Sequence, residues 1–269
     1  MQQLRNFIEK YVYAGFGTLW ILVSSLFLGR SRGKLAQVAE YFGWKNPLKS
    51  YPLVLPKIGP ATLFPGVIPL DLYDPVGQDG NASLLELVIL NHLVRVSKAS
   101  SIFEFGTFDG RTTLNLAANT PENARIYTLD LPDEEVTSAK ANPLGDTKFT
   151  GKVETGYKYK RHPLGKKVVQ LLGDSVRFDF SAYKNSVDFI FVDAAHTYPY
   201  VMSDTRAALE MLRPDGIVLW HDYRSSCEGV STALNELFSK GGVYGKMRHI
   251  EGTNLAVLLP DDFARLLAR

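Results

Sequence analysis

The chain has 269 residues, of which 45% are apolar, 22% are charged and 12% are aromatic. Such a composition is typical of a globular protein with a sizeable core and excludes intrinsic disorder. The formal net charge is +2, which argues against a dedicated nucleic-acid-binding protein. The single cysteine, Cys227, excludes an intramolecular disulfide and a multi-cysteine zinc cluster, and it suits a reducing compartment.

The N-terminal region is unusually apolar, because residues 11–29 contain no charged side chain. As a helix this run is about 28 Å long, close to the ~30 Å hydrocarbon core of a bilayer. Arg30, Arg32 and Lys34 follow it, and this positive flank predicts that the rest of the chain is cytoplasmic. We therefore predict an apolar helix in residues 1–34 that anchors the protein to the inner face of a membrane. The alternative is a helix that packs on the domain or on a partner subunit, as in a homo-oligomer.

Residues 35–80 form a second region, rich in proline, and half of the chain's 14 prolines lie in 46–80. Proline at this density is incompatible with a helix or a central strand. Because the prolines alternate with large apolar residues, we predict an extended strap on the surface of the protein. The strap is also a candidate for part of a substrate entrance.

From residue 81 onward, helix and strand signals alternate, which predicts one α/β domain over 81–269. Its first helix starts near Asn81, where Ser83 and Glu86 have the spacing of a capping box. Such alternation is typical of a mostly parallel sheet with helices on both faces. We predict strands at 101–106, 125–130, 168–174, 187–193, 217–222 and 255–259, and further helices at 111–119, 200–212 and 230–238.

Polar residues close three of these strands, and ligands bind outside the carboxyl ends of strands in such sheets. After the first strand, Gly106 and Gly110 allow a tight turn and a close backbone approach to a ligand. Asp130 ends the second strand, where a carboxylate can accept hydrogen bonds from ribose hydroxyls. The third strand ends in 173–175 (Gly-Asp-Ser), in place to meet an adenine amino group. In this order, the residues indicate a nucleoside cofactor.

Six segments carry a resemblance to a known family: FEFGTFDGRTT, YTLDLP, LLGDS, DFIFVDAAHTYPYV, LRPDGIVLWHDY and EGTNLAVL. They resemble class I S-adenosylmethionine-dependent methyltransferases, in particular the bacterial branch called methyltransferase domain 24. This branch is similar to the sugar O-methyltransferases of macrolide biosynthesis. The resemblance covers about residues 80–260 and implies a Rossmann-like fold with a mostly parallel seven-stranded sheet. It does not cover the apolar N-terminus.

The resemblance also implies a set of cofactor-binding residues. Glu104, Gly106 and Gly110 would hold the methionine part of the cofactor. Asp130 would bind the ribose, and the 174–175 pair would lie on the adenine side. The complete set is Glu104, Gly106, Thr107, Gly110, Thr112, Asp130, Leu131, Gly173, Asp174, Ser175 and Asp193.

The ends of the fourth and fifth strands supply the candidate chemistry. In the related sugar enzymes, acids at the positions of Asp193, His221 and Asp222 bind magnesium, and the histidine matching His196 is the base. Here position 221 is a histidine, and imidazole favours later transition metals over magnesium. We therefore predict a divalent metal, magnesium or a transition metal, on Asp193, His221 and Asp222. His196 is the expected base, and His221 is a second candidate for that role.

Three classes of function remain open. The first is O-methylation of a hydroxyl on a sugar, a glycolipid or a small molecule. The second is a nicotinamide-dependent oxidoreductase, because Asp130 can also hold a nicotinamide-cofactor ribose, although 106–110 is not G-x-G-x-x-G. The third is a non-catalytic binding protein on a methyltransferase fold. A variant of the methyltransferase site would place iron on two histidines and one carboxylate, namely His196, His221 and Asp193. The basic stretch 148–167 could attract a phosphate group or an anionic leaflet, or be a solvated loop.

Overall fold

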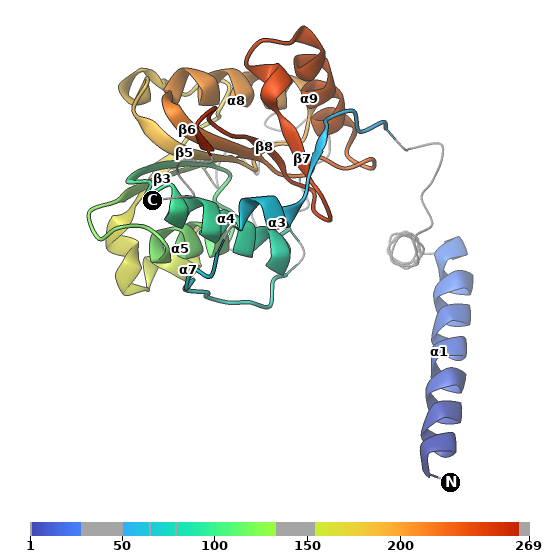
Figure 1. Ribbon diagram of the computed structural model, residues 1–269. Coiled ribbons are helices and arrows are strands. Elements are labelled where there is room, and N and C mark those ends of the chain that lie inside the picture. The colour runs from blue at the N-terminus through green and yellow to red at the C-terminus, as the bar shows by residue number, and fades with distance from the viewer. Residues whose placement is uncertain (1, 28–50, 65, 79, 133–153, 264–269) are drawn as a thin grey trace. The chain divides into compact units, whose positions relative to one another are not determined.

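The computed structural model describes residues 2–27, 51–64, 66–78, 80–132 and 154–263. The chain divides into two compact units, Met1–Ser50 and Tyr51–Arg269 (Figure 1). The described part of the first unit is a single helix, α1 (Gln2–Phe27). Everything that positions the candidate site belongs to the second unit.

Helix α1 agrees with the predicted apolar helix, whereas residues 28–34 and their basic side chains lie outside the described residues. Within the described ranges, no helix combines the length and the hydropathy needed to cross a membrane. The prediction that residues 11–29 span a bilayer is therefore not supported. The physical reason is composition, since three glycines, two serines and a threonine dilute the apolar residues of this run.

The second unit is built on one sheet of eight strands in the order β1-β7-β8-β6-β5-β2-β3-β4. Neighbouring strands are parallel except β8, which runs antiparallel to β6 and β7. The mostly parallel sheet is confirmed, but it has eight strands where seven were expected. The strands are β1 (Lys57–Ile58), β2 (Ser101–Phe105), β3 (Arg125–Asp130), β4 (Val168–Leu172), β5 (Val187–Val192), β6 (Leu212–Trp220), β7 (Arg248–Ile250) and β8 (Ala256–Leu258).

The eighth strand comes from the proline-rich strap. Strand β1 pairs with β7 at the edge of the sheet. A proline-rich segment is tolerated there because a missing N–H group at an edge does not interrupt the hydrogen bonds between central strands. The strap also forms one helical turn, α3 (Pro60–Leu63), with its proline at the first helical position. Proline is tolerated there because the first N–H groups of a helix have no intrahelical partner. The expectation that the strap excludes all helix was therefore too strict. Residues 35–50 of the strap lie outside the described residues.

Helices cover both faces of the sheet (Figure 1). Helices α8 (Tyr198–Met211) and α9 (Glu228–Lys240) lie on one face, and α4 (Leu84–Val96) and α5 (Arg111–Ala118) lie on the other. Strand β5 therefore sends alternate apolar side chains into two separate cores. The remaining single turns are α7 (Tyr157–Lys160), η3 (Pro163–Lys167), η4 (Ser181–Tyr183) and η5 (Tyr244–Lys246).

The capping box expected before the first domain helix is confirmed. Ser83 is the N-cap of α4, its side chain accepts from the Glu86 N–H, and the Glu86 carboxylate accepts from the Ser83 N–H. Two amide side chains of α5 hold the strap that leads into this helix. Asn115 exchanges two hydrogen bonds with the backbone of Tyr73, and Asn119 does the same with Asp71. The strap is thereby fixed where it enters α4.

The strand order reverses at β2, which has β3 on one side and β5 on the other. The chain leaves β2 and β5 toward opposite sides of the sheet, and a crevice opens at the carboxyl ends of these strands. The topology therefore places the ligand site at the loops that follow β2 and β5.

Candidate active site

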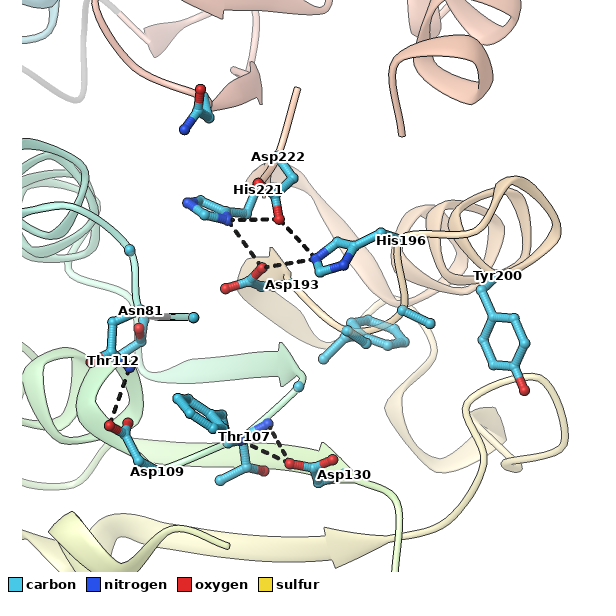
Figure 2. A pocket seen from close by; sticks show the side chains of 18 of the residues that line it. Asn81, Thr107, Asp109, Thr112, Asp130, Asp193, His196, Tyr200, His221 and Asp222 are labelled. Atoms are coloured by element: carbon cyan, nitrogen blue, oxygen red, sulfur yellow. Dashed lines mark hydrogen bonds and ion pairs between the residues drawn. The ribbon is translucent and has the colours of Figure 1, made fainter. Parts of the chain in front are cut away.

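A cavity of about 550 Å³ lies at this edge of the sheet. Its size falls within the range of small-molecule and cofactor sites. Its walls come from the ends of β2 to β6, the start of α4 and the last residues of the strap (Figure 2). The predicted site residues on its wall are Gly106, Thr107, Thr112, Asp130, Leu131, Gly173, Ser175, Asp193, His196, His221 and Asp222.

The loop after β2 depends on Gly106, which has a φ of 88°. A Cβ atom at this position would lie 2.2 Å from the carbonyl oxygen of Asp193. Such a contact is impossible, so only glycine lets the loops after β2 and β5 meet. The cofactor loop and the candidate chemistry are therefore in direct backbone contact.

Asp130 holds this loop from the neighbouring strand. Its Oδ2 atom accepts hydrogen bonds from the N–H groups of Thr107 and Phe108, at 3.1 and 2.8 Å. Its Oδ1 atom accepts from the Leu131 N–H at 2.8 Å. The carboxylate is half-buried and lies on the cavity wall. The position suits recognition of ribose hydroxyls.

Glu104 does not lie on the wall, although it was expected to contact the cofactor. Its side chain is buried behind the loop and accepts hydrogen bonds from the hydroxyls of Thr113 and Thr128. Burial raises the pKa of this carboxyl to about 8, because the two hydroxyls offset only part of the desolvation. Glu104 is therefore uncharged at neutral pH and supports the loop after β2 from behind.

Two further predicted cofactor residues also lie off the wall. Gly110 has a φ of 82° and serves as the N-cap of α5, where an added Cβ would lie 2.6 Å from the Tyr159 ring. Asp174 accepts a hydrogen bond from the Val176 N–H at 3.1 Å and shapes the turn after β4. Both residues set the backbone of the site rather than its surface.

Four polar side chains meet at the other end of the cavity (Figure 2). His196 Nε2 lies 2.8 Å from Asp222 Oδ2 and 4.0 Å from Asp193 Oδ1. His221 Nδ1 lies 3.2 Å from Asp193 Oδ1 and 3.5 Å from Asp222 Oδ2. The structure thus brings together all four residues that the sequence singled out for chemistry.

The second nitrogen of His221 meets a fifth residue, which the sequence did not indicate as part of the site. His221 Nε2 lies 3.2 Å from the carboxylate of Glu86, a buried residue of α4 that also accepts from the Asn254 N–H at 2.7 Å. The only sequence signal of Glu86 was its place in the capping box. A local pattern gives no indication of a partner on a distant strand end.

These contacts make His221 a cation. Burial alone would lower its pKa, but Asp193, Asp222 and Glu86 raise the pKa well above the ordinary value of 6.5. Burial raises the pKa of Glu86, and the stronger opposing effects of His221 and two backbone N–H groups bring it to about 2. Both ring nitrogens of His221 are thus donors. This geometry disfavours the predicted roles of His221 as a base or as a metal ligand.

The arrangement offers a different metal-binding set from the predicted one. Ligand atoms of Asp193, His196 and Asp222 all lie within 4.8 Å of one another. One imidazole and two carboxylates fit a divalent ion, with a better match to a transition metal than to magnesium. His221, the second histidine of the alternative iron site, places Nε2 against Glu86 and Nδ1 against Asp193.

The loop that carries His196 packs directly on the start of α9. A Cβ atom at Gly229 would lie 2.1 Å from the His196 carbonyl oxygen. This close contact holds the backbone of His196 against a helix. The nearby cavity wall is made of small or polar side chains: Ser83, Arg224, Ser226, Cys227 and Asn254.

The basic stretch 148–167 is largely tied into the domain where the structure describes it. Lys158 pairs with Asp74 and with Asp109, and Lys167 donates to the carbonyls of Ala117 and Thr120. These lysines serve as internal bridges. Lys148 and Lys152 lie outside the described residues.

Comparison with known proteins gives a match to one family model and similarity to several solved structures. Residues 103–223 match a family model described as a methyltransferase domain. Three solved structures are similar to the chain, each with 68% of it covered. They are the Streptomyces achromogenes O-methyltransferase TomG with SAM (18% identity, 82% of that chain, TM-score 0.48), a Bacillus cereus O-methyltransferase with SAH (17%, 84%, 0.48) and the Podospora anserina methyltransferase PaMTH1 with SAH (19%, 81%, 0.49). No curated protein matches the chain.

The family match runs from β2 to the residue after Asp222, which is less than half of the chain. It includes the loops after β2 and β5 that contribute to the cavity wall. The mostly parallel sheet with helices on both faces is the Rossmann-like architecture that the resemblance implied. Residues 103–223 thus match a methyltransferase domain.

The buried carboxyl of Glu104 generates a prediction about stability. Its pKa is about 8 in the folded state and about 4.5 in the unfolded state, so the unfolded state loses the proton first. The free energy of unfolding should therefore fall as the pH rises from about 4.5 to 8. Glu104→Gln keeps a neutral side chain at every pH. Between pH 5.5 and 7.5 we expect the parent to lose roughly 2 kcal/mol relative to the variant in urea unfolding.

The exposed Glu122, paired with Lys166, provides the matched control. Glu122→Gln should leave the parent's pH dependence almost unchanged, because surface ion pairs contribute little. Parallel pH profiles for the parent and Glu104→Gln would show that Glu104 is ionised in the folded protein.

Proposed function

We propose that the protein transfers the methyl group of S-adenosylmethionine to a hydroxyl oxygen, with His196 as the base. The observation that carries this proposal is the His196–Asp222 pair at 2.8 Å, on the wall of the same cavity as Asp130. The backbone contact between Gly106 and Asp193 links the Asp130 end of the cavity to the His196 end. The cofactor would then extend from the β4 end past Asp130 toward His196.

The reaction is an in-line displacement at the methyl carbon. A lone pair of the acceptor oxygen forms the new O–C bond, and the S–C electron pair returns to sulfur, which leaves S-adenosylhomocysteine. The hydroxyl proton passes to His196 as the oxygen attacks. Asp222, whose Oδ2 lies 2.8 Å from His196 Nε2, stabilises the imidazolium that forms. Most of the rate acceleration would come from holding oxygen, methyl and sulfur in line.

A polar acceptor rich in hydroxyl groups, such as a sugar, suits the cavity beside His196. The wall there carries Ser83, Ser226 and Asn254, which can exchange hydrogen bonds with several hydroxyls. The wall also carries three aromatic side chains, Phe105, Phe108 and Tyr200.

Asp193, His196 and Asp222 would hold a divalent ion if the reaction uses one. When bound, the ion would lower the pKa of the acceptor hydroxyl and balance the two carboxylates. In that case Asp222 acts as a ligand rather than as the partner of a basic histidine. The two versions of the site differ in their response to a chelator.

Asp130 provides the first test, on cofactor binding alone. Asp130→Ala removes hydrogen-bond acceptors from the ribose and from the loop after β2. We expect the dissociation constant of S-adenosylhomocysteine, measured by calorimetry, to rise at least tenfold, as for hydrogen bonds to a charged group. Asp261→Ala, which removes an exposed partner of Lys246, is the control and should leave binding unchanged. Unaltered affinity in Asp130→Ala would remove the ribose assignment.

His196 provides the second test, on the chemical step. General-base catalysis contributes roughly 10²- to 10⁴-fold, so His196→Gln should lose rate in that range while it keeps its cofactor affinity. The rate is measured with labelled methyl donor and a panel of sugar acceptors. His162→Gln removes another half-buried histidine, outside the cavity, and should retain the parental rate.

Asp222→Asn and a chelator then separate the two versions of the site. Asparagine tolerates the left-handed backbone of residue 222, whose φ is 57°. Loss of activity in both the variant and the chelated parent indicates a metal. Loss in the variant alone indicates the His196–Asp222 pair. Full activity of His196→Gln would contradict its role as the base.

A further inference from the structure

A second group of ionisable side chains lies at the far end of the cavity, where β4 ends and α8 begins. Ser175 and Tyr200 lie on the cavity wall at this end. Asp204 follows Tyr200 by one helical turn, so the two side chains share a face of α8. The side chain of Asp204 is completely buried.

Asp204 is unusual because its burial is not compensated. Neither carboxyl oxygen receives a hydrogen bond of ordinary geometry from the described residues. The polar group that its carboxyl faces is the Ser175 hydroxyl, and the nearest charge is that of Asp174, which also interacts with the Tyr200 hydroxyl. A buried carboxylate without donors is strongly unfavourable, so a role for this group is expected.

The neutral form of Asp204 resolves this conflict. Burial and the charge of Asp174 raise the pKa of Asp204 to about 7, and the Ser175 hydroxyl opposes part of this rise. A protonated carboxyl can donate its hydrogen to Ser175 Oγ, and the serine hydroxyl is then free to donate into the cavity. An ionised carboxylate would instead attract the serine hydrogen and leave only an acceptor on the cavity side.

We propose that Asp204 is a positioning residue for the adenosyl end of the cofactor, which sets the direction of the Ser175 hydrogen bond. In its protonated form it makes Ser175 a donor toward a ring nitrogen of the adenine. The inference rests on the proposed function, in which the adenine lies at the end of β4. Asp204 acts through Ser175, since it does not itself line the cavity.

The test is the pH dependence of S-adenosylhomocysteine binding to the full chain, measured by calorimetry between pH 6 and pH 8. The parent should bind about tenfold more weakly at pH 8, because the proton that Asp204 needs is lost in this range. Asp204→Asn donates from its amide to Ser175 at every pH, so its affinity should stay near the parent's value at pH 6. Ser175→Ala should bind more weakly at both pH values and show no slope.

Asp261→Ala is the matched control, because it removes an exposed carboxylate that lies outside the cavity. It should keep the parental slope. A parental affinity that is constant or rises with pH, or a slope that survives in Asp204→Asn, would overturn the inference. An absence of binding by the parent at every pH would contradict the proposed cofactor site itself, which is a different result from binding without a slope.

Discussion

The buried imidazolium of His221 is the interaction on which the chemistry end of the cavity depends. Three carboxylates, Glu86, Asp193 and Asp222, lie around this one ring, with nitrogen–oxygen distances of 3.2 to 3.5 Å. Without a cation between them, three acids in a largely buried space would repel one another and take up protons. The positive charge of His221 lowers the pKa of Glu86 and of Asp222.

The same charge ties together parts of the chain that are distant in sequence. Glu86 comes from the start of α4, which the strap delivers to the cavity, and its second oxygen binds the Asn254 N–H near β8. Asp193 follows β5, and its carbonyl oxygen packs against Gly106 in the loop after β2. Asp222 turns its Oδ2 toward His196. The His221 cation thus fixes Asp222, the partner of the proposed base His196, relative to the loop after β2.

Much of the fold could be predicted from the sequence because its signals are local. Buried parallel strands appear as short apolar runs, and β3 was predicted with its exact bounds for this reason. The strand-end rule also placed Asp130, Asp193 and His196 at one edge of the sheet. Strands β1 (Lys-Ile) and β7 (Arg-His-Ile) were missed because neither is an apolar run, whereas the equally short β8 (Ala-Val-Leu) is one and was predicted.

The roles of the site residues were harder to predict because they depend on distant partners. Asp193 and Asp222 raise the pKa of the His221 ring from neighbouring strand ends, and Glu86 adds to this effect from a part of the chain 135 residues away. Glu104 follows the glycine-loop pattern of a cofactor ligand, yet it points behind the loop, toward Thr113 and Thr128. Strand alternation gives the face on which a side chain lies, but not which polar group it meets there.

His221 lies between three carboxylates that raise its pKa and favour its cationic form. The most direct measurement of this charge is nitrogen-15 NMR of the histidine side chains between pH 6 and pH 9, with His221→Gln used for assignment. Both ring nitrogens of His221 should keep their protons at pH values at which an ordinary histidine has lost one. A His221 ring that titrates near the ordinary histidine pKa of ~6.5 would contradict this expectation.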